Sequence, residues 1–148
     1  MLLESLPALA RLGVRLKLFG SYGGRVLRGL EDARVELVGK VPRESVMKAH
    51  GEAWGLLFPS VCEEPLPYAV IESALAGTVP LVSSVGGVLE ILRGTRAERF
   101  VFRVGDAGDL VSKVEELIGV GSEEVREIGE KTKSVVLERL KESINNLP

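Results

Sequence analysis

Two glutamates, Glu64 and Glu72, form the part of the sequence best suited to chemistry. The seven residues between them are Pro65-Leu66-Pro67-Tyr68-Ala69-Val70-Ile71. An apolar, strand-like run stops at Pro59, and a helical pattern begins near Pro67, because proline is favoured in a first helical turn. Eight residues of helix span roughly 12 Å, so the spacing argues against a close acid–base pair. The two carboxylates are instead placed to hold two ends of one long ligand.

The start of this predicted helix adds a third binding element. N–H groups at a helix N-terminus lack intrahelical acceptors and attract phosphate. A carboxylate, a helix N-terminus and a second carboxylate would therefore match the hydroxyls, phosphates and hydroxyls of a nucleotide sugar. The simpler alternatives are a solvated surface pair at Glu63 and Glu64 and an exposed helix position at Glu72.

Glycines follow two other predicted strands. Gly86 and Gly87 come after one strand and precede a helix that carries Glu90. Because glycine has no Cβ, this backbone could approach a ligand closely, or it could simply form a turn. The segment from Gly20 to Gly24 could do the same after an earlier strand. The glycines do not form G-x-G-x-x-G and no Walker A sequence occurs, so dinucleotide and P-loop sites are not favoured.

Two further side chains are assigned no chemistry. His50 is predicted to cap or line a helix surface rather than to act as a base. Cys62 is predicted to be a small apolar filler, because no base is expected beside it. As the single cysteine in the sequence, Cys62 also excludes an internal disulfide and a cysteine-based metal cluster.

Alternating strands and helices must position these loops. Apolar, β-branched runs predict strands at 14–19, 35–38, 55–58, 79–83 and 100–104. Helical periodicity is found at 2–12, 42–50, 67–76, 85–92 and 107–118, and in a charged tail at 122–148 that holds one long helix or two. This alternation predicts an α/β, doubly wound, mainly parallel Rossmann-like sheet of about five strands flanked by helices. Such sheets bind ligands at the carboxyl ends of their strands, where the loops above lie.

Composition limits the class of protein. The 148 residues predict one domain over 1–148, with 122–148 as its C-terminal helical tail. A net charge of −2 offers no general attraction to nucleic acid. No apolar run is long enough for an integral membrane segment, and the start lacks a basic n-region, so we expect a cytoplasmic protein. Gln is absent and Asn scarce beside abundant Glu, Lys and Arg, which suggests a thermophile.

The combined pattern resembles the donor-binding, C-terminal domain of family 4 glycosyltransferases, which have the two-domain GT-B fold. The resemblance rests on Phe58-Pro59-Ser60, on the E-x7-E motif from Glu64 to Glu72, on the small-residue run from Ala74 to Val82, and on Gly86-Gly87-Val88-Leu89-Glu90. Weaker likenesses are Gly20-Ser21-Tyr22-Gly23, Val38-Gly39 with Val41-Pro42, and Gly105-Asp106 with Leu110. The resemblance runs from about Leu2 to the C-terminal tail, which is nearly the whole chain.

The resemblance implies a role for each motif. Glu64, as the catalytic residue, would face the hydroxyls of the transferred sugar, and Glu72 those of the ribose. Val41 would line the base, and the other implied residues would lie near the sugar and diphosphate. The implied donor-binding residues are Gly20, Val41, Leu66, Pro67, Tyr68, Ala69, Glu72, Gly86 and Gly87. Family members usually retain anomeric configuration, with a nucleotide-diphosphate sugar as donor substrate and neither metal nor cofactor.

Two parts of the family pattern have no counterpart here. They are the acceptor-binding domain and the strand opening the donor domain, which carries an Arg and a Lys that clamp the diphosphate. Arg25 is a conceivable substitute for one cation. We therefore expect one of two situations. The chain is a fragment of a longer reading frame, or it has a partner at an exposed sheet edge, which is either an acceptor-domain polypeptide or a second copy in a homo-oligomer. The alternative functions are a non-catalytic nucleotide-sugar-binding or interaction module and, less in keeping with the motifs, another doubly wound protein such as a GT-B epimerase.

Overall fold

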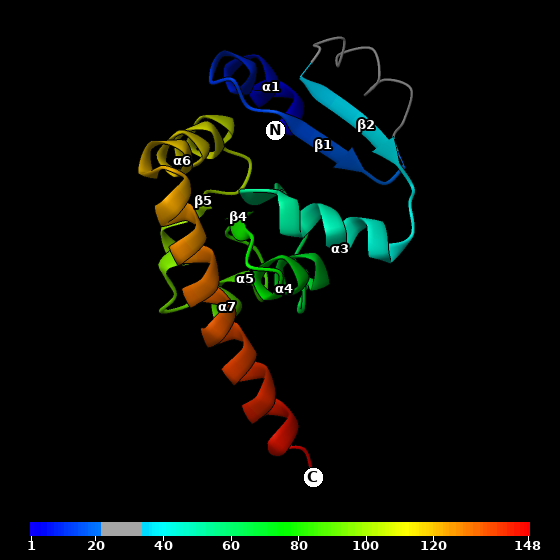
Figure 1. Ribbon diagram of the computed structural model, residues 1–148, viewed down its shortest axis with the longest axis vertical. Coiled ribbons are helices and arrows are strands. Elements are labelled where there is room, and N and C mark those ends of the chain that lie inside the picture. Colours follow the sequence, from blue (N-terminus) through cyan, green and yellow to red (C-terminus); the bar gives the residue numbers. More distant parts are fainter. Residues whose placement is uncertain (22–33) are drawn as a thin grey trace.

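The computed structural model describes residues 1–21 and 34–148. Its elements are, in chain order, α1 (Leu2–Arg11), β1 (Leu16–Phe19), β2 (Val35–Gly39), α3 (Arg43–Glu52), β3 (Gly55–Phe58), α4 (Tyr68–Leu75), β4 (Val79–Ser83), α5 (Val88–Leu92), the 3-10 helix η1 (Arg96–Phe100), β5 (Val101–Phe102), α6 (Ala107–Val120) and α7 (Ser122–Asn145). The predicted alternation of strands and helices is confirmed (Figure 1). Tyr22, Gly23, Gly24 and Arg25 lie outside the described residues.

The five strands found in residues 1–21 and 34–148 form two parallel sheets. β1 pairs with β2, and β3, β4 and β5 pair in that order. The predicted α/β class, strand number and parallel direction are confirmed. The expected single sheet is divided in two. Within residues 1–21 and 34–148, no strand joins β1 to β3 by pairing with both.

The core surrounds β4. Every residue of Val79–Ser83 is buried, as expected for a parallel strand covered on both faces. Phe100, Phe102, Leu110 and Ile128 are the largest side chains packed around it from η1, β5, α6 and α7. Helix α1 packs on α6 at one side, and α4 packs on α7 at the other. This arrangement fixes β3 and α4, and with them the loop that carries Glu64.

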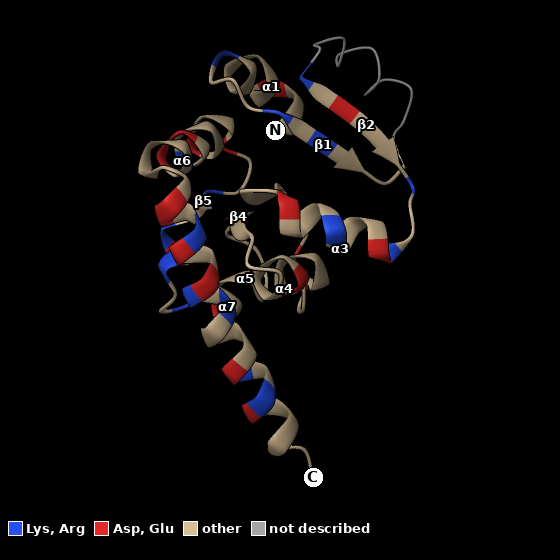
Figure 2. Cartoon of the chain, viewed as in Figure 1, with Lys and Arg blue, Asp and Glu red and all other residues tan. Residues whose placement is uncertain are grey.

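Helix α7 is a single helix and extends beyond the rest of the structure (Figure 1). It is anchored by Val125, Ile128 and Val136, which are buried. At Gly129 the helix touches the turn before β4, because a Cβ there would lie 2.0 Å from the Gly77 carbonyl oxygen. Acidic and basic residues are both present along its length (Figure 2). The predicted helical tail is thus confirmed as one helix.

Several predicted boundaries differ from the structure by one to three residues, and two of these differences have clear local causes. The strand expected at 100–104 ends at Phe102, because the Arg103 amide donates to the Asp109 carboxylate at 2.8 Å instead of to a strand. The helix expected at 85–92 begins at Val88, because the Val85 amide bonds to the Ser83 carbonyl at 2.8 Å and Gly86 has φ of 52°. Both segments make a turn before they reach the next element.

Candidate functional site

The loop after β3 and the turn after β4 touch through their backbones. The Gly87 amide donates to the Glu64 carbonyl at 3.0 Å. A Cβ on Gly86 would lie 2.3 Å from the Glu64 carbonyl oxygen, and one on Gly87 would lie 2.0 Å from that of Pro65. The sequence suggests that the two glycines leave room for a ligand. In the structure they leave room for the backbone of Glu64 and Pro65, because a Cβ at either position would clash with it.

This contact leaves the Glu64 carboxylate available. The carbonyl of Glu64 holds the glycine turn, whereas its side chain is exposed. A second link secures the base of the loop, since the Ser83 hydroxyl at the end of β4 donates to the Ser60 carbonyl. An exposed carboxylate on an anchored backbone is suited to accept hydrogen bonds from hydroxyl groups.

Helix α4 starts immediately after this loop. Pro67, predicted as the first helical residue, is buried and serves as the N-cap, so the helix begins one residue later than predicted, at Tyr68. The Val70 and Ile71 amides both reach the Pro67 carbonyl, at 3.0 and 3.3 Å. The preceding N–H groups, of Tyr68 and Ala69, lie where a helix has no intrahelical acceptor. Leu66 and Tyr68 side chains are 49% and 69% exposed around this end of the helix.

Glu72 lies in the second turn of α4, as predicted, and is paired with a cation. Nη2 of Arg43 lies 2.5 Å from its Oε1, and the Glu72 side chain is only 20% exposed. Arg43 is the first residue of α3 and follows Val41 by two positions. The ion pair therefore brings the loop after β2 against the helix after β3. No spacing in the sequence indicates Arg43, because the contact exists only between packed helices.

Gly20 joins the same region through β2. Its amide donates to the Gly39 carbonyl at 2.9 Å, so the end of β1 is fixed beside the loop that contains Val41. The predicted donor-binding residues thus fall into two groups. In the first group, Gly20 and Val41 lie just after β1 and β2, and Glu72 lies where α3 contacts α4. Glu64, Gly86 and Gly87 form the second group, and the first turn of α4 connects the two.

His50 is buried rather than on a helix surface, so the prediction for it is wrong. Its backbone carbonyl accepts the Thr78 hydroxyl, and its Nε2 has no hydrogen-bond partner in the part of the chain that the structure describes. Burial lowers the pKa of His50, and the nearby Glu72 carboxylate offsets part of this decrease. His50 is therefore neutral at pH 7, and Arg43 supplies the positive charge beside Glu72.

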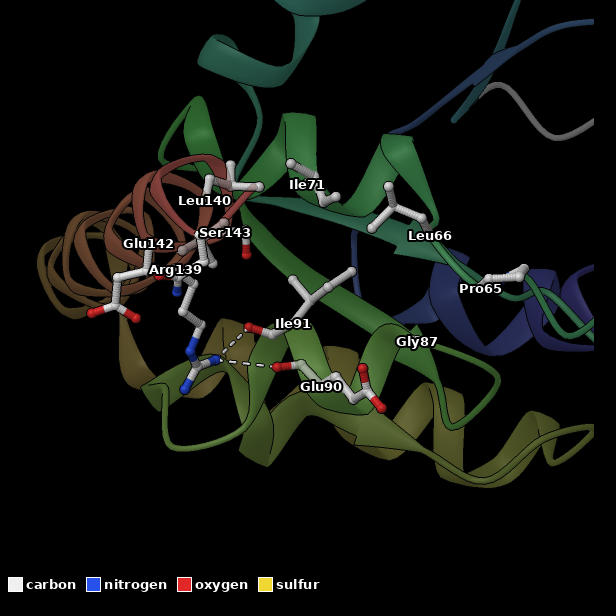
Figure 3. Close-up of a pocket in the computed structure, with 12 residues that line it drawn as sticks. Pro65, Leu66, Ile71, Gly87, Glu90, Ile91, Arg139, Leu140, Glu142 and Ser143 are labelled. Atoms are coloured by element: carbon white, nitrogen blue, oxygen red, sulfur yellow. Dashed lines mark hydrogen bonds between the residues drawn. The ribbon is translucent and has the colours of Figure 1, made fainter. Parts of the chain in front are cut away.

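A separate pocket of about 380 Å³ lies between the Pro65–Leu66 segment, α5 and the end of α7 (Figure 3). Arg139 crosses it, and its Nη1 donates to the carbonyls of Ile91 at 2.8 Å and Glu90 at 3.3 Å, at the C-terminal end of α5. The lining includes Leu66 and Gly87 but neither Glu64 nor Glu72. The pocket therefore borders the predicted donor residues from the α7 side without containing both carboxylates.

Two features are absent from residues 1–21 and 34–148. No group of three or more His, Cys, Asp or Glu side chains is arranged to hold a metal ion. No helix there has the length and apolar character needed to cross a membrane.

Solved structures share this fold at low sequence identity. Sucrose-phosphate synthase from Thermosynechococcus elongatus matches 92% of the chain at 22% identity with a TM-score of 0.77. A glycosyltransferase from Rickettsia africae matches 93% at 16% identity and 0.77. Anabaena HepE, in complex with UDP-glucose, matches 99% at 16% identity and 0.74. The chain spans only 37%, 38% and 44% of these proteins, respectively, and its fold is that of one half of the GT-B architecture.

Comparison with curated protein sequences gives no match. The profile of the family described as "Glycosyl transferases group 1" matches residues 1–119, which include every residue predicted above for the donor site. This match covers most of the sequence and agrees with the fold, so the chain belongs to the group 1 glycosyltransferases.

Proposed function

We propose that this chain is the donor half of a retaining glycosyltransferase and binds a nucleotide-diphosphate sugar. The observation that carries the proposal is the arrangement around α4, whose N-terminus lies between the exposed Glu64 loop and the half-buried Glu72. Glu72 would bind the ribose hydroxyls, the first amides of α4 the diphosphate, and Glu64 the hydroxyls of the transferred sugar. No metal or cofactor has a role in this proposal.

The comparisons support the class of ligand. HepE, a protein of the same fold, is described in complexes with UDP and glucose and with UDP-glucose. The chain here spans 44% of HepE, so an acceptor would be bound by residues outside this sequence, or by a partner. We therefore assign donor binding to this chain and place sugar transfer in an assembly with an acceptor domain.

Titration calorimetry with UDP-, GDP- and ADP-sugars tests the proposal. One of the three should bind, and Glu72→Ala should weaken it by about 1.5–3 kcal/mol through lost ribose hydrogen bonds, which is roughly a 10- to 150-fold increase in Kd. Glu44→Ala removes the same charge from an exposed position in the first turn of α3 and should leave Kd within about twofold.

Two results would contradict this assignment in different ways. No heat from any of the three nucleotide sugars at millimolar concentration would remove nucleotide-sugar binding altogether. Binding that Glu72→Ala leaves unchanged would keep the function but move the ribose site away from α4.

A non-catalytic nucleotide-sugar-binding module is the second candidate. The chain spans only 37–44% of the similar structures, so donor binding can be assigned to it without sugar transfer. An assay for free nucleoside diphosphate, run with and without an acceptor-domain partner, distinguishes the transferase from the binding module. Release that requires the partner supports the transferase, and binding without release in either sample supports the module.

A further inference from the structure

Within residues 1–21 and 34–148, the Glu72 carboxylate is held through one of its two oxygens. The ion pair joins Nη2 of Arg43 to Oε1 of Glu72 at 2.5 Å. A carboxylate accepts about four hydrogen bonds, and two belong to each oxygen. Oε2 therefore keeps its acceptor capacity while Oε1 is fixed by the guanidinium.

The surroundings of Glu72 make this restraint necessary. The Glu72 side chain is 20% exposed. Two residues of α3 lie near it: His50, which is buried and neutral, and Arg43, which is 78% exposed. Among the described residues, no ion pair holds this carboxylate on its His50 side, so without Arg43 it would rotate toward water. Arg43 is at the solvent side and draws the carboxylate to one orientation.

Arg43 itself is well placed for this role. It is the first residue of α3, so its backbone is set by the helix start at Pro42, and its side chain crosses to α4. The charge-assisted bond is short, and such bonds to ionised groups are about twice as strong as neutral ones. A single oxygen of a carboxylate fixed in this way is a preorganised acceptor for a hydroxyl group.

We propose that Arg43 is a positioning residue for nucleotide recognition: it orients Glu72 so that the free oxygen accepts hydrogen bonds from ribose hydroxyls. This inference rests on the proposed function and deepens it, because it makes the ribose preference depend on a residue that lies on a different helix from Glu72. Arg43 acts through Glu72 and does not bind the nucleotide itself.

The test compares a nucleoside diphosphate with its 2′,3′-dideoxy counterpart by calorimetry, using whichever of UDP, GDP and ADP binds tightest. The wild type should bind the ribose form at least about tenfold more tightly than the dideoxy form, because one charge-assisted hydrogen bond changes Kd by about that factor. Arg43→Ala and Arg43→Gln should weaken the ribose form about tenfold and leave the dideoxy form nearly unchanged. Arg43→Lys, which keeps the charge, should restore part of the preference.

Lys48→Ala is the matched control, because it removes one positive charge from an exposed position on the same helix. It should change neither Kd. Melting temperatures of all variants verify that each remains folded.

The remaining outcomes each overturn a defined statement. If Arg43→Ala binds the ribose form more tightly, Arg43 competes with the nucleotide. If Arg43→Ala weakens the ribose and dideoxy forms equally, the role of Arg43 is purely structural. Either result overturns the positioning role and leaves the proposed function intact. A wild type that binds a nucleotide without preferring ribose also overturns it. A wild type that binds none of the three nucleotides or their sugars overturns the proposed function, and the role of Arg43 with it.

Discussion

Glu64 and Glu72 have the same side chain but different surroundings. Glu64 is exposed, and its backbone, not its carboxylate, is engaged by the turn at Gly87. Glu72 is half-buried, and its carboxylate is already paired with Arg43. A carboxylate fixed by a partner suits recognition of a constant group such as ribose, whereas a free and exposed one can adjust to the sugar that is transferred.

This difference predicts which part of the ligand each residue affects. Glu64→Ala should leave the affinity for the free nucleoside diphosphate within twofold, because that ligand lacks the sugar. The same variant should weaken the nucleotide sugar by about 5- to 30-fold, for a lost hydrogen bond of about 1–2 kcal/mol. Parallel calorimetric titrations measure both affinities, and Glu63→Ala, an exposed neighbour, serves as the control. If both ligands weaken equally, Glu64 supports the loop and does not face the sugar.

Local spacing explains why some site residues could be predicted and others could not. Glu72 was placed correctly in the second turn of α4 because Pro67 marks the start of that helix. The Gly86-Gly87 pair was recognised as a close approach, but the group approached is the Glu64–Pro65 backbone. Arg43 and the burial of His50 depend on how α3 packs against α4. A contact between two helices leaves no periodic pattern in either one.

At the scale of elements, α4 is the connection between the site and the rest of the fold. It carries Glu72, begins directly after the loop that contains Glu64, and packs on α7. Helix α7 in turn holds α5 through Arg139, whose guanidinium donates to carbonyls at the end of that helix (Figure 3). α5 starts at the Gly86-Gly87 turn, so α7 supports both loops of the candidate site.

The close contact of α7 with the turn before β4 can be tested by a single methyl group. Gly129→Ala places a Cβ about 2.0 Å from the Gly77 carbonyl oxygen, so the helix must move. We expect a loss of about 1–3 kcal/mol in unfolding free energy, or about 2–12 °C in Tm for a chain of this size. Thermal unfolding followed by circular dichroism measures it.

Gly119→Ala provides the matched comparison for this change. It makes the same substitution within α6, at an exposed position where a Cβ meets nothing within 4 Å. It should be neutral or stabilise by up to about 1 kcal/mol through helix propensity. A Gly129→Ala protein as stable as Gly119→Ala would show that α7 does not need the contact at Gly77.

The ends of strands also depend partly on local residues and partly on contacts with the next element. The strands at 55–58 and 79–83 were predicted to the residue, because Gly55, Pro59 and the β-branched run at 79–83 are local signals. β5 ended early because the side chain of Asp109 accepts the Arg103 amide. This hydrogen bond comes from the start of the next helix and competes with strand pairing, which residue preferences alone do not represent.

At the scale of the whole molecule, the division of the sheet is the main departure from the expected fold. All four residues of β3 are partly exposed although their sequence is apolar, whereas β4 beside it is fully buried. An apolar run of this kind is typical of a parallel strand with neighbours on both sides. β3 thus has the sequence of an interior strand, and within the described residues it pairs only with β4.

The division predicts unequal local stability. A two-stranded sheet is marginal by itself, and segments with few buried contacts open at lower free energy than the core. Amides in β1 and β2 should therefore exchange with deuterium at least about tenfold faster than those in β4, a difference of about 1.4 kcal/mol in opening free energy. Mass spectrometry of peptides from residues 14–19, 34–39 and 79–83 measures the rates.

A bound nucleotide sugar should reduce this difference. Under the proposed function the ligand extends from the loop after β2 to the Glu64 loop, so it joins the β1–β2 sheet to the larger one through Val41 and Glu72. Exchange in 34–39 should slow more than exchange in 79–83, where β4 is already buried. Glu72→Ala should abolish the slowing at ligand concentrations that saturate only the wild type. Equal rates in all three segments without ligand would mean that the two sheets open as one unit, and the division would then have no energetic consequence.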